Sequence, residues 1–390
     1  TTLSTHTIIK KGIIVSQNTS EVGQIISANN LPDTLPAFTK KSNVADSRLG
    51  AKSLFATDDF FADKSRILNP DAPIFVVGKF DDNGKWMDGW ETRRKRHLGY
   101  DYLVIQLARP TKIAGLDIDT SHFTGNFPSS ASVDALYAPE LLQQDEAELT
   151  SLSKEDWDGK NWQALVGMTP LQGHNHELIE IDNEQTVTHI RLNIYPDGGV
   201  ARLRVYGDIQ LDASLNTQGE TLDLAGALNG GRAIASNDAH FGEASNLLLP
   251  TKAPNMGDGW ETRRRREPGN DWCIIALGQA GIVDSIEIDT AHFKGNYPDK
   301  VSIQAVYSSN TPEQTLVTQS MFWETLLEPQ KTNADDIHHF GKDKLQIDQP
   351  ITHIRVNIFP DGGISRVRVY GKIAEANIDT GTNTDSKETK

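Results

Sequence analysis

The chain has 390 residues, of which 37% are hydrophobic and 23% are charged. This is the composition of a soluble globular protein that is long enough for two domains. Its formal net charge of −15 at pH 7 disfavours nucleic acids and anionic membranes as partners, and its single cysteine excludes both an intrachain disulfide and a zinc site built from several thiolates.

The N-terminal stretch, TTLSTHTIIKKGIIVSQ, lacks the basic start, the long apolar middle and the small-residue cleavage site of a signal peptide. No apolar run in the chain approaches the roughly 20 residues that a transmembrane helix needs. We therefore expect a cytoplasmic protein that makes no contact with a membrane.

Three long motifs occur twice in the chain, in the same order. DGWETRRKR at residues 88–96 returns as DGWETRRRR at 258–266, and LDIDTSHFTGNFP at 116–128 returns as IEIDTAHFKGNYP at 286–298. VTHIRLNIYPDGGVARLRVYG at 187–207 returns as ITHIRVNIFPDGGISRVRVYG at 351–371. The first copy has a loop around residues 71–87 that is ten residues longer than its counterpart. The sequence is thus predicted to be a tandem duplication.

The motifs and the polar stretches between them predict the domain boundaries. We place the first repeat at residues 1–208, a polar linker at 209–220, the second repeat at 221–373 and a tail at 374–390. The tail contains almost no apolar residues, so it is predicted to be disordered.

Within each copy the hydrophobic pattern is typical of strands. In 353–359, Ile354, Val356 and Ile358 alternate with polar residues that include His353 and Arg355, which predicts one buried face and one solvent-exposed face. His189 lies at the matching position of the first copy. Pro, Gly, Asn and Asp separate the strand-like runs, and helical pattern is scarce outside residues 139–156. These features predict an all-β fold of two antiparallel β-sandwiches, with Cys273 buried in a strand.

The order of these elements, from DWCIIALGQAGIVDSIEID through VSIQAVYS to SRVRVYG, resembles the galactose-binding-like jelly rolls. Over about residues 45–373, the three tandem motifs together resemble the allantoicase family. The resemblance implies two jelly-roll repeats that hydrolyse allantoate to ureidoglycolate and urea in purine catabolism. It also implies a C–N bond hydrolase with a small-molecule substrate, and we expect it to assemble as a homo-oligomer.

The residues of the motifs suit that chemistry. Allantoate carries one carboxylate and two ureido groups, and an arginine fork can grip a carboxylate with two parallel hydrogen bonds. Proton transfer to departing urea and from water needs a carboxylate or histidine with a pKa near neutrality. The candidate substrate-binding residues are Trp90, Arg93, Arg94, Asn126 and Arg202, with Trp260, Arg263, Arg264, Asn296 and Arg366 in the second repeat. The candidate catalytic residues are Glu91, Asp119 and His122, with Glu261, Asp289 and His292 in the second repeat.

Simpler interpretations stay open for each group. Alternate Glu and Arg residues can form surface ion pairs, and Asp119 and Asp289 can satisfy turn amides. His122 and His292 can donate to a backbone carbonyl, and the glycines of PDGG can serve only to permit a positive φ. The active site can lie in one repeat, in both, or between repeats or subunits. A non-catalytic tandem module that binds a ureide or a carbohydrate is the alternative function.

A required metal is not indicated. His174, His176, His338 and His339 supply imidazoles, but the His-x-His pair is not repeated and neither HExxH nor a calcium loop occurs. No nucleotide-binding glycine motif is present. We therefore predict no cofactor, and a divalent cation held by loop carbonyls stays an open alternative.

Overall fold

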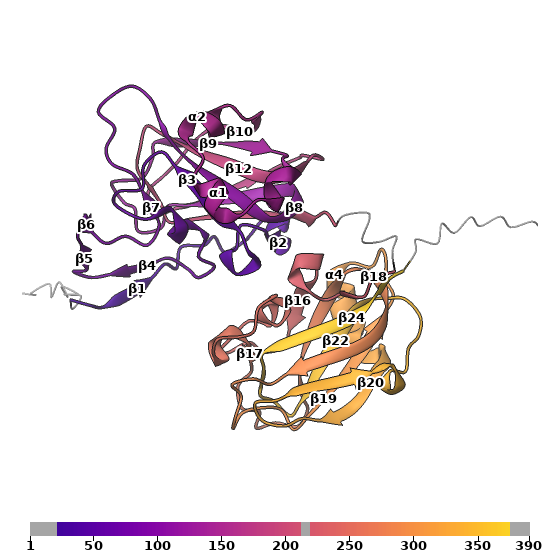
Figure 1. The fold of residues 1–390 in the computed structure, drawn as a ribbon. Coiled ribbons are helices and arrows are strands. Elements are labelled where there is room, and N and C mark those ends of the chain that lie inside the picture. Colours follow the sequence, from indigo (N-terminus) through magenta and orange to yellow (C-terminus); the bar gives the residue numbers. More distant parts are fainter. Residues whose placement is uncertain (1–21, 212–218, 375–390) are drawn as a thin grey trace, which may run out of the picture.

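In the computed structural model, which describes residues 22–211 and 219–374, each repeat forms its own β-sandwich (Figure 1). All strand pairs are antiparallel, and the two sandwiches are built alike, so the predicted tandem of jelly rolls is confirmed. Part of the predicted linker, 212–218, and the predicted tail beyond Ala374 lie outside the described residues.

The first sandwich contains an eight-stranded sheet in the order β10-β9-β12-β8-β14-β2, and β3 and β11 also pair with β8. Its strands are β2 (Ser42–Asn43), β3 (Lys52–Ala56), β8 (Asp101–Asp119), β9 (Ser130–Leu136), β10 (Gln163–Pro170), β11 (His176–Glu180), β12 (Thr186–Tyr195) and β14 (Arg202–Ile209).

The second sandwich repeats this topology in the order β15-β24-β18-β22-β19-β20, with β16 and β21 paired to β18. Its strands are β15 (Leu222–Asp223), β16 (Arg232–Ser236), β18 (Asp271–Asp289), β19 (Lys300–Val306), β20 (Glu324–Lys331), β21 (Ile337–Gly341), β22 (Ile351–Phe359) and β24 (Arg366–Ile373).

One long strand in each repeat joins the two layers of the sandwich. β8 and β18 both run for 19 residues. The N-terminal half of β8 pairs with β12 and β3, whereas its C-terminal half pairs with β14 and β11. The end of β8 at Asp119 therefore lies at the same end of the sandwich as the start of β14 at Arg202, with which it pairs.

The inward faces of the strands form one apolar core in each repeat, and Cys273 belongs to the second core. Cys273 is 0% exposed, so the prediction of a buried cysteine is confirmed, and its complete burial raises the pKa of the thiol.

The opposite strand face is covered, which corrects our expectation of solvent exposure. In the first repeat, the short helices α1 (Glu146–Thr150) and α2 (Lys154–Asp158) bring Trp157 over this face, and both Trp157 and His189 are 0% exposed. Burial lowers the pKa of His189 to about 4. In the second repeat, α4 (Glu313–Gln319) and Trp323 form a similar satellite core. Polar alternation indicated the strand correctly, but it could not reveal that an insertion packs on the polar side.

The ten-residue insertion of the first repeat forms structure of its own. It contains β4 (Ile74–Val76), which pairs with β1 (Ile25–Ser27), and a hairpin of β5 (Phe80–Asp81) and β6 (Gly84–Lys85). Figure 1 shows these strands to one side of the main sandwich. The insertion thus adds a wall to the loop end of the first repeat.

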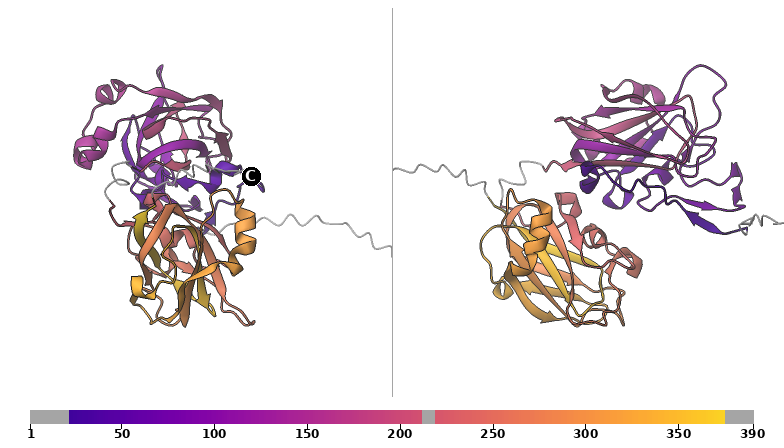
Figure 2. Two further views of the ribbon diagram at one scale, coloured as in Figure 1. Left: turned by 90° about the vertical axis from the view of Figure 1, so that its right-hand side faces the viewer. Right: turned by 180° about the vertical axis from the view of Figure 1, so that it is seen from behind.

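Figure 2 shows the two repeats next to each other, and hydrogen bonds join them. The Arg48 guanidinium donates to the side chain of Asn246 at 3.0 Å, and Arg232 donates to the carbonyl of Lys40 at 3.0 Å. No helix in the described residues is long and apolar enough to span a membrane.

Candidate functional site

The three repeated motifs converge at one end of each sandwich. In the first repeat, β7 (Trp90–Glu91) pairs with β13 (Gly199–Val200), and the Gly199 amide donates to the carbonyl of Asn126 at 2.7 Å. In the second repeat, β17 (Trp260–Glu261) pairs with β23 (Gly363–Ile364) in the same way. Segments about 100 residues apart in sequence therefore build one loop surface.

The glycines of the PDGG turn make this convergence possible. Gly198 has a φ of 139° and Gly362 a φ of 131°, so the predicted need for a positive φ is confirmed. A Cβ on Gly199 would lie 2.0 Å from the ring of Phe123, so the close packing of this turn also needs a glycine.

Glu91 and Asn126 form a hydrogen-bonded pair at this surface. The Asn126 amide donates to Glu91 Oε1 at 2.5 Å, and Glu91 is only 9% exposed. Burial raises the pKa of Glu91 and outweighs the lowering effect of the hydrogen bond from Asn126. Glu261 and Asn296 pair at the same distance in the second repeat, although Glu261 is only half-buried.

His122 lies beside this pair with a strained backbone. Its φ is 66°, and the equivalent His292 has a φ of 71°, a region that residues other than glycine seldom occupy and that often marks functional sites. The His122 Nε2 lies 3.1 Å from the carbonyl of Pro73, so Nε2 carries the proton and Nδ1 is left as an acceptor. Burial, and to a smaller extent the neighbouring His174, lowers the pKa of His122.

A cavity of about 370 Å³ joins these groups in the first repeat. Its lining residues are Phe61, Lys85, Met87, Glu91, His122, Thr124, Gly125 and Asn126. The cavity therefore combines a buried carboxyl group, a neutral imidazole, an amide and one cation, a set that can bind a small anion and transfer protons.

The arginines of the first DGWETRRKR motif lie in a different cavity, of about 930 Å³. Arg93 donates through Nε to Asp58 at 2.7 Å, and Lys95 pairs with Asp101 at 2.8 Å. Arg94 and Arg96 are exposed and form no ion pair with any described residue. The structure therefore does not bring the predicted arginines and Glu91 together around one ligand.

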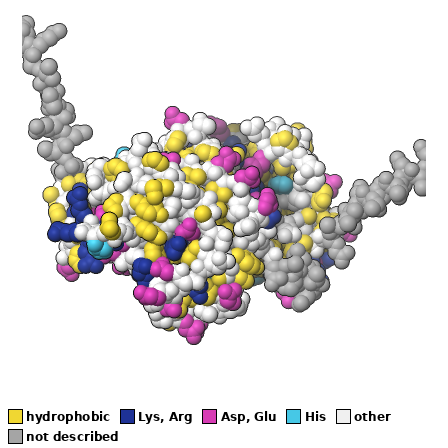
Figure 3. Space-filling model, turned by 90° about the horizontal axis from the view of Figure 1, so that it is seen from above, with side chains coloured by type: hydrophobic (Ala, Val, Ile, Leu, Met, Phe, Trp, Pro, Cys, Tyr) yellow, Lys and Arg dark blue, Asp and Glu magenta, His cyan; other side chains and the backbone are white. Residues whose placement is uncertain are grey.

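In the second repeat, too, a basic residue held by an aspartate is followed by an exposed arginine. Arg263 pairs with Asp238 at 3.2 Å and Arg265 with Asp271 at 2.8 Å, whereas the next residue after each arginine is exposed. Those residues, Arg264 and Arg266, form no ion pair within the described ranges. Figure 3, a view from the side of the first repeat, shows Lys and Arg side chains gathered at one edge of that face.

Four residues that were predicted to contact a ligand are instead buried in the fold. The side chains of Trp90 and Trp260 are 0% exposed and donate through Nε1 to the carbonyls of Asp58 and Asp238. Arg202 and Arg366 are 0% and 2% exposed. The structure gives these side chains a supporting position rather than the predicted contact with a ligand.

The guanidinium of Arg202 forms its hydrogen bonds within the fold. It donates to the Asp88 carboxylate at 2.7 Å and to the carbonyls of Asp88, Ala201 and Asp71 at 2.7–3.0 Å. In the second repeat, Arg366 binds Asp258 in the same manner at 2.6 Å. Both arginines therefore anchor the aspartate that opens the DGWETRR motif.

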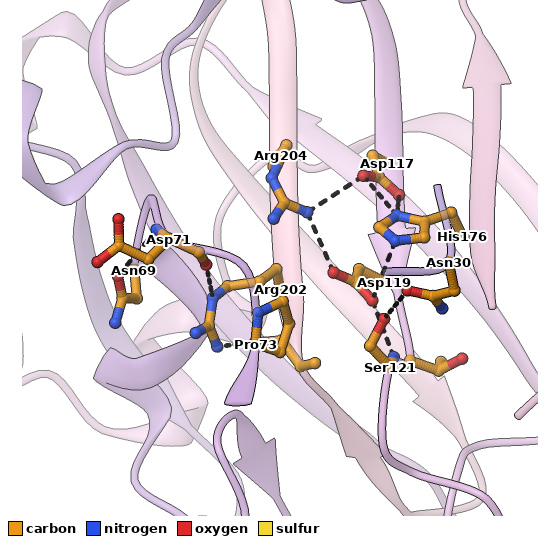
Figure 4. Close-up of polar contacts among 12 residues, drawn as sticks. Asn30, Asn69, Asp71, Pro73, Asp117, Asp119, Ser121, His176, Arg202 and Arg204 are labelled. Carbon is orange, nitrogen blue, oxygen red and sulfur yellow. Dashed lines mark hydrogen bonds and ion pairs between the residues drawn. The ribbon is translucent and has the colours of Figure 1, made fainter. Parts of the chain in front are cut away.

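Asp119 shapes the turn that carries His122, and Figure 4 shows its contacts with Ser121 and Arg204. It is 0% exposed, accepts the Ser121 amide at 2.8 Å and lies 3.2 Å from Arg204, which also contacts Asp117. Asp289 accepts the equivalent amide at 2.7 Å. Neither aspartate is among the residues that line the first-repeat cavity, and the turn-forming interpretation fits both of them.

The first repeat has a histidine opposite Asp119, where the second repeat has an apolar residue opposite Asp289. His176 Nδ1 lies 3.0 Å from both oxygens of Asp117, and its β11 position faces Asp119 in register, where the second repeat has Ile337 facing Asp289. Burial lowers the pKa of His176, but its hydrogen bond with Asp117 and the nearby acidic charges more than compensate, so the pKa is raised overall.

The two imidazoles of the His-x-His sequence thus have different partners. His174 accepts the His122 amide at 3.0 Å, whereas His176 faces Asp117. Within the described ranges, no group of three or more His, Cys, Asp or Glu side chains is arranged to hold a metal ion.

Two kinds of site residue were missed in the sequence. Lys85 belongs to no repeated motif, and its only signal was the ten-residue insertion. Asp58 and Asp238 hold the first arginine of each motif, and their signal was an aspartate at the same place after the strand in each copy.

Comparison with known proteins agrees with the duplication. The family model for the allantoicase repeat matches residues 42–210 and 222–374. Probable allantoicase 1 of Burkholderia mallei is 53% identical over 87% of this chain and 96% of its own length. A probable allantoicase of Acinetobacter baumannii is 53% identical over 90% of this chain and 98% of its own length. The crystal structure of allantoicase from Saccharomyces cerevisiae aligns with a TM-score of 0.69 and 32% identity, over 85% of this chain and 94% of that one. The chain therefore belongs to the allantoicase family of enzymes.

Proposed function

We propose that the chain hydrolyses allantoate to ureidoglycolate and urea, and that the reaction takes place in the first-repeat cavity around Glu91. The single observation that carries this proposal is the pairing, in one cavity, of a buried carboxyl group whose pKa is raised with an imidazole whose pKa is lowered. Such opposed shifts are typical of acid and base partners in active sites.

In the reaction, the bond between the central carbon and one ureido nitrogen breaks, and a bond to a water oxygen forms. Protonated Glu91 donates its proton to the departing urea nitrogen. His122 Nδ1, which has no hydrogen on it in the tautomer that the Pro73 carbonyl selects, accepts a proton from the attacking water. The proton passes from His122 back to Glu91 before the next turnover.

The remaining groups of the site position these two. Asn126 holds Glu91 through its amide, and Asp119 holds the turn that presents His122. Arg94 and Arg96, which have no acidic partner in the described structure, supply positive potential at the same loop end of a chain with net charge −15. A local cationic patch of this kind increases the rate at which an anionic substrate arrives.

The alternative function is a tandem module that binds a ureide or a carbohydrate without turning it over. It needs hydrogen-bonding groups in the loops but no carboxyl group with a raised pKa. Cytoplasmic location and homo-oligomeric assembly stay predictions from the sequence.

The test is urea release from allantoate by the purified chain, measured before and after treatment with a chelator. We expect urea to form at a rate proportional to protein concentration, to persist after chelation, and to fall at least 100-fold in Glu91→Gln, in which an amide replaces the acid. Binding of allantoate in calorimetry without any urea release would refute the hydrolase and favour the binding module. Loss of activity after chelation would instead indicate that the chain needs a divalent cation.

A further inference from the structure

We propose that Lys85, supplied by the insertion of the first repeat, receives the substrate carboxylate, and that only the first repeat turns substrate over. This inference rests on the proposed function and assigns to it a carboxylate anchor other than the arginines that the motifs suggested.

Lys85 is the one Lys or Arg side chain among the residues that line the cavity of the proton-transfer groups. It lines the same cavity as Glu91, His122 and Asn126, and its charge acts on Glu91 in the direction that lowers the pKa of the carboxyl group. Arg93 lines the other cavity and is held by Asp58.

The ammonium group of Lys85 is available for an anion. Its side chain is exposed, and it forms no ion pair with any described residue. The Nζ atom lies 4.4 Å from the centre of the Phe75 ring. An aromatic face of this kind orients an ammonium group by cation–π attraction and leaves its N–H groups free to donate. A substrate carboxylate that enters the cavity therefore finds a preoriented donor beside the catalytic pair.

The ten-residue insertion that carries Lys85 has no counterpart in the second repeat. The ring of His122 contacts the carbonyl of Pro73, and the ring of His292 contacts that of Ala253, which identifies these two positions as equivalent. From Pro73 the chain needs fifteen residues to reach Asp88, whereas from Ala253 it needs only five to reach Asp258.

The second repeat fills the equivalent place with a short helical turn. η7 (Met256–Asp258) brings Met256 Sδ to 3.9 Å from the amide nitrogen of Asn296. Glu261 and Asn296 remain paired there, but the side chain beside them is the apolar thioether of Met256 and not a lysine supplied by an insertion. The cation of this loop, Lys294 at the position of Thr124, already lies 3.8 Å from the carboxylate of Asp335, so a substrate carboxylate would have to compete with Asp335 for its charge.

The experiment compares matched variants of the full chain. Lys85→Met is measured beside Lys79→Met, because Lys79 lies in the same insertion, with its Nζ 3.7 Å from the centre of the Trp86 ring, but does not line the cavity. Each variant is assayed with allantoate and with the neutral primary amide of allantoate, which lacks the carboxylate charge. Glu91→Gln is measured beside Glu261→Gln.

We expect Lys85→Met to lower kcat/KM for allantoate about 10- to 100-fold, the range for one hydrogen bond to a charged group. The effect should lie mainly in KM and should be less than threefold for the amide, and Lys79→Met should change neither substrate more than twofold. Glu261→Gln should keep at least half of the wild-type rate. An equal loss for acid and amide, or unchanged kinetics in Lys85→Met, would refute the anchor.

If Glu261→Gln loses as much activity as Glu91→Gln, the proposal that only the first repeat is active is refuted. Absence of urea release by the wild-type chain would instead refute the proposed function itself, so the two failures are distinguishable.

Discussion

The replacement of Arg202 by Met separates a structural arginine from a ligand-binding one. The variant keeps most of the side-chain volume but removes four hydrogen bonds, including the one to the Asp88 carboxylate. Asp88 is 8% exposed and, among the described residues, would keep only the Ile74 amide, at 2.9 Å, as a donor to its side chain. Removing one member of a buried ion pair costs about 3–5 kcal/mol, because the other charge stays buried without its partner.

For a domain of this size, each kcal/mol corresponds to about 2–4 °C in Tm, so we expect the first repeat to melt roughly 6–20 °C lower. Differential scanning calorimetry measures this shift, with Arg93→Met as the control. The Arg93 side chain is 62% exposed and its pair with Asp58 should contribute at most about 1 kcal/mol. The double variant with Asp88→Asn should be less destabilised than Arg202→Met alone. A wild-type Tm for Arg202→Met together with a raised KM for allantoate would show that this reasoning is wrong and that Arg202 binds substrate.

Three further predictions follow from the same geometry. Because the proposed mechanism needs a neutral His122 and a protonated Glu91, whose pKa values are lowered and raised respectively, kcat/KM should follow a bell against pH. It falls on the acid side as His122 gains a proton and on the alkaline side as Glu91 loses one. A profile that keeps its alkaline limb in Glu91→Gln with residual activity would contradict the assignment of the acid. The double variant Arg94→Gln, Arg96→Gln should lower kcat/KM several-fold at low ionic strength and little at 0.5 M salt, and a salt-independent loss would argue for direct contact instead of steering. Cys273 should resist alkylation in the native protein, and Cys273→Ala should keep full activity; rapid labelling with loss of activity would contradict its burial in the core.

Much of the fold could be predicted because its signals are local. The alternation of Ile354, Val356 and Ile358 with polar residues marks a strand whatever the rest of the chain does, since successive side chains of a strand point to opposite faces. The PDGG glycines could likewise be assigned to a positive φ from the needs of a tight turn. The same alternation wrongly predicted that His189 is exposed, because the burial of the polar strand face depends on an insertion that packs on it.

The site was only partly predictable. Glu91, His122 and Asn126 were named from the motifs, and the structure brings them to one cavity. Arg93 and Arg202 were named on equal terms, yet one is exposed beside Asp58 and the other is enclosed with Asp88. Both were named from residue type and spacing alone, and these could not distinguish the exposed arginine from the buried one.

The sequence by itself determined the tandem duplication, the β-sandwich architecture and the residue types gathered at the loop end, because repeats and periodicity are properties of the chain read in order. Only the tertiary structure decided which of those residues share a cavity. The DGWETRR segment pairs with a turn more than 100 residues away, and the direction of each side chain follows from that pairing. The pairing turns Glu91 towards one cavity and leaves Arg93 and Arg94 in another, and the insertion brings Lys85, which belongs to no repeated motif, to the side of Glu91.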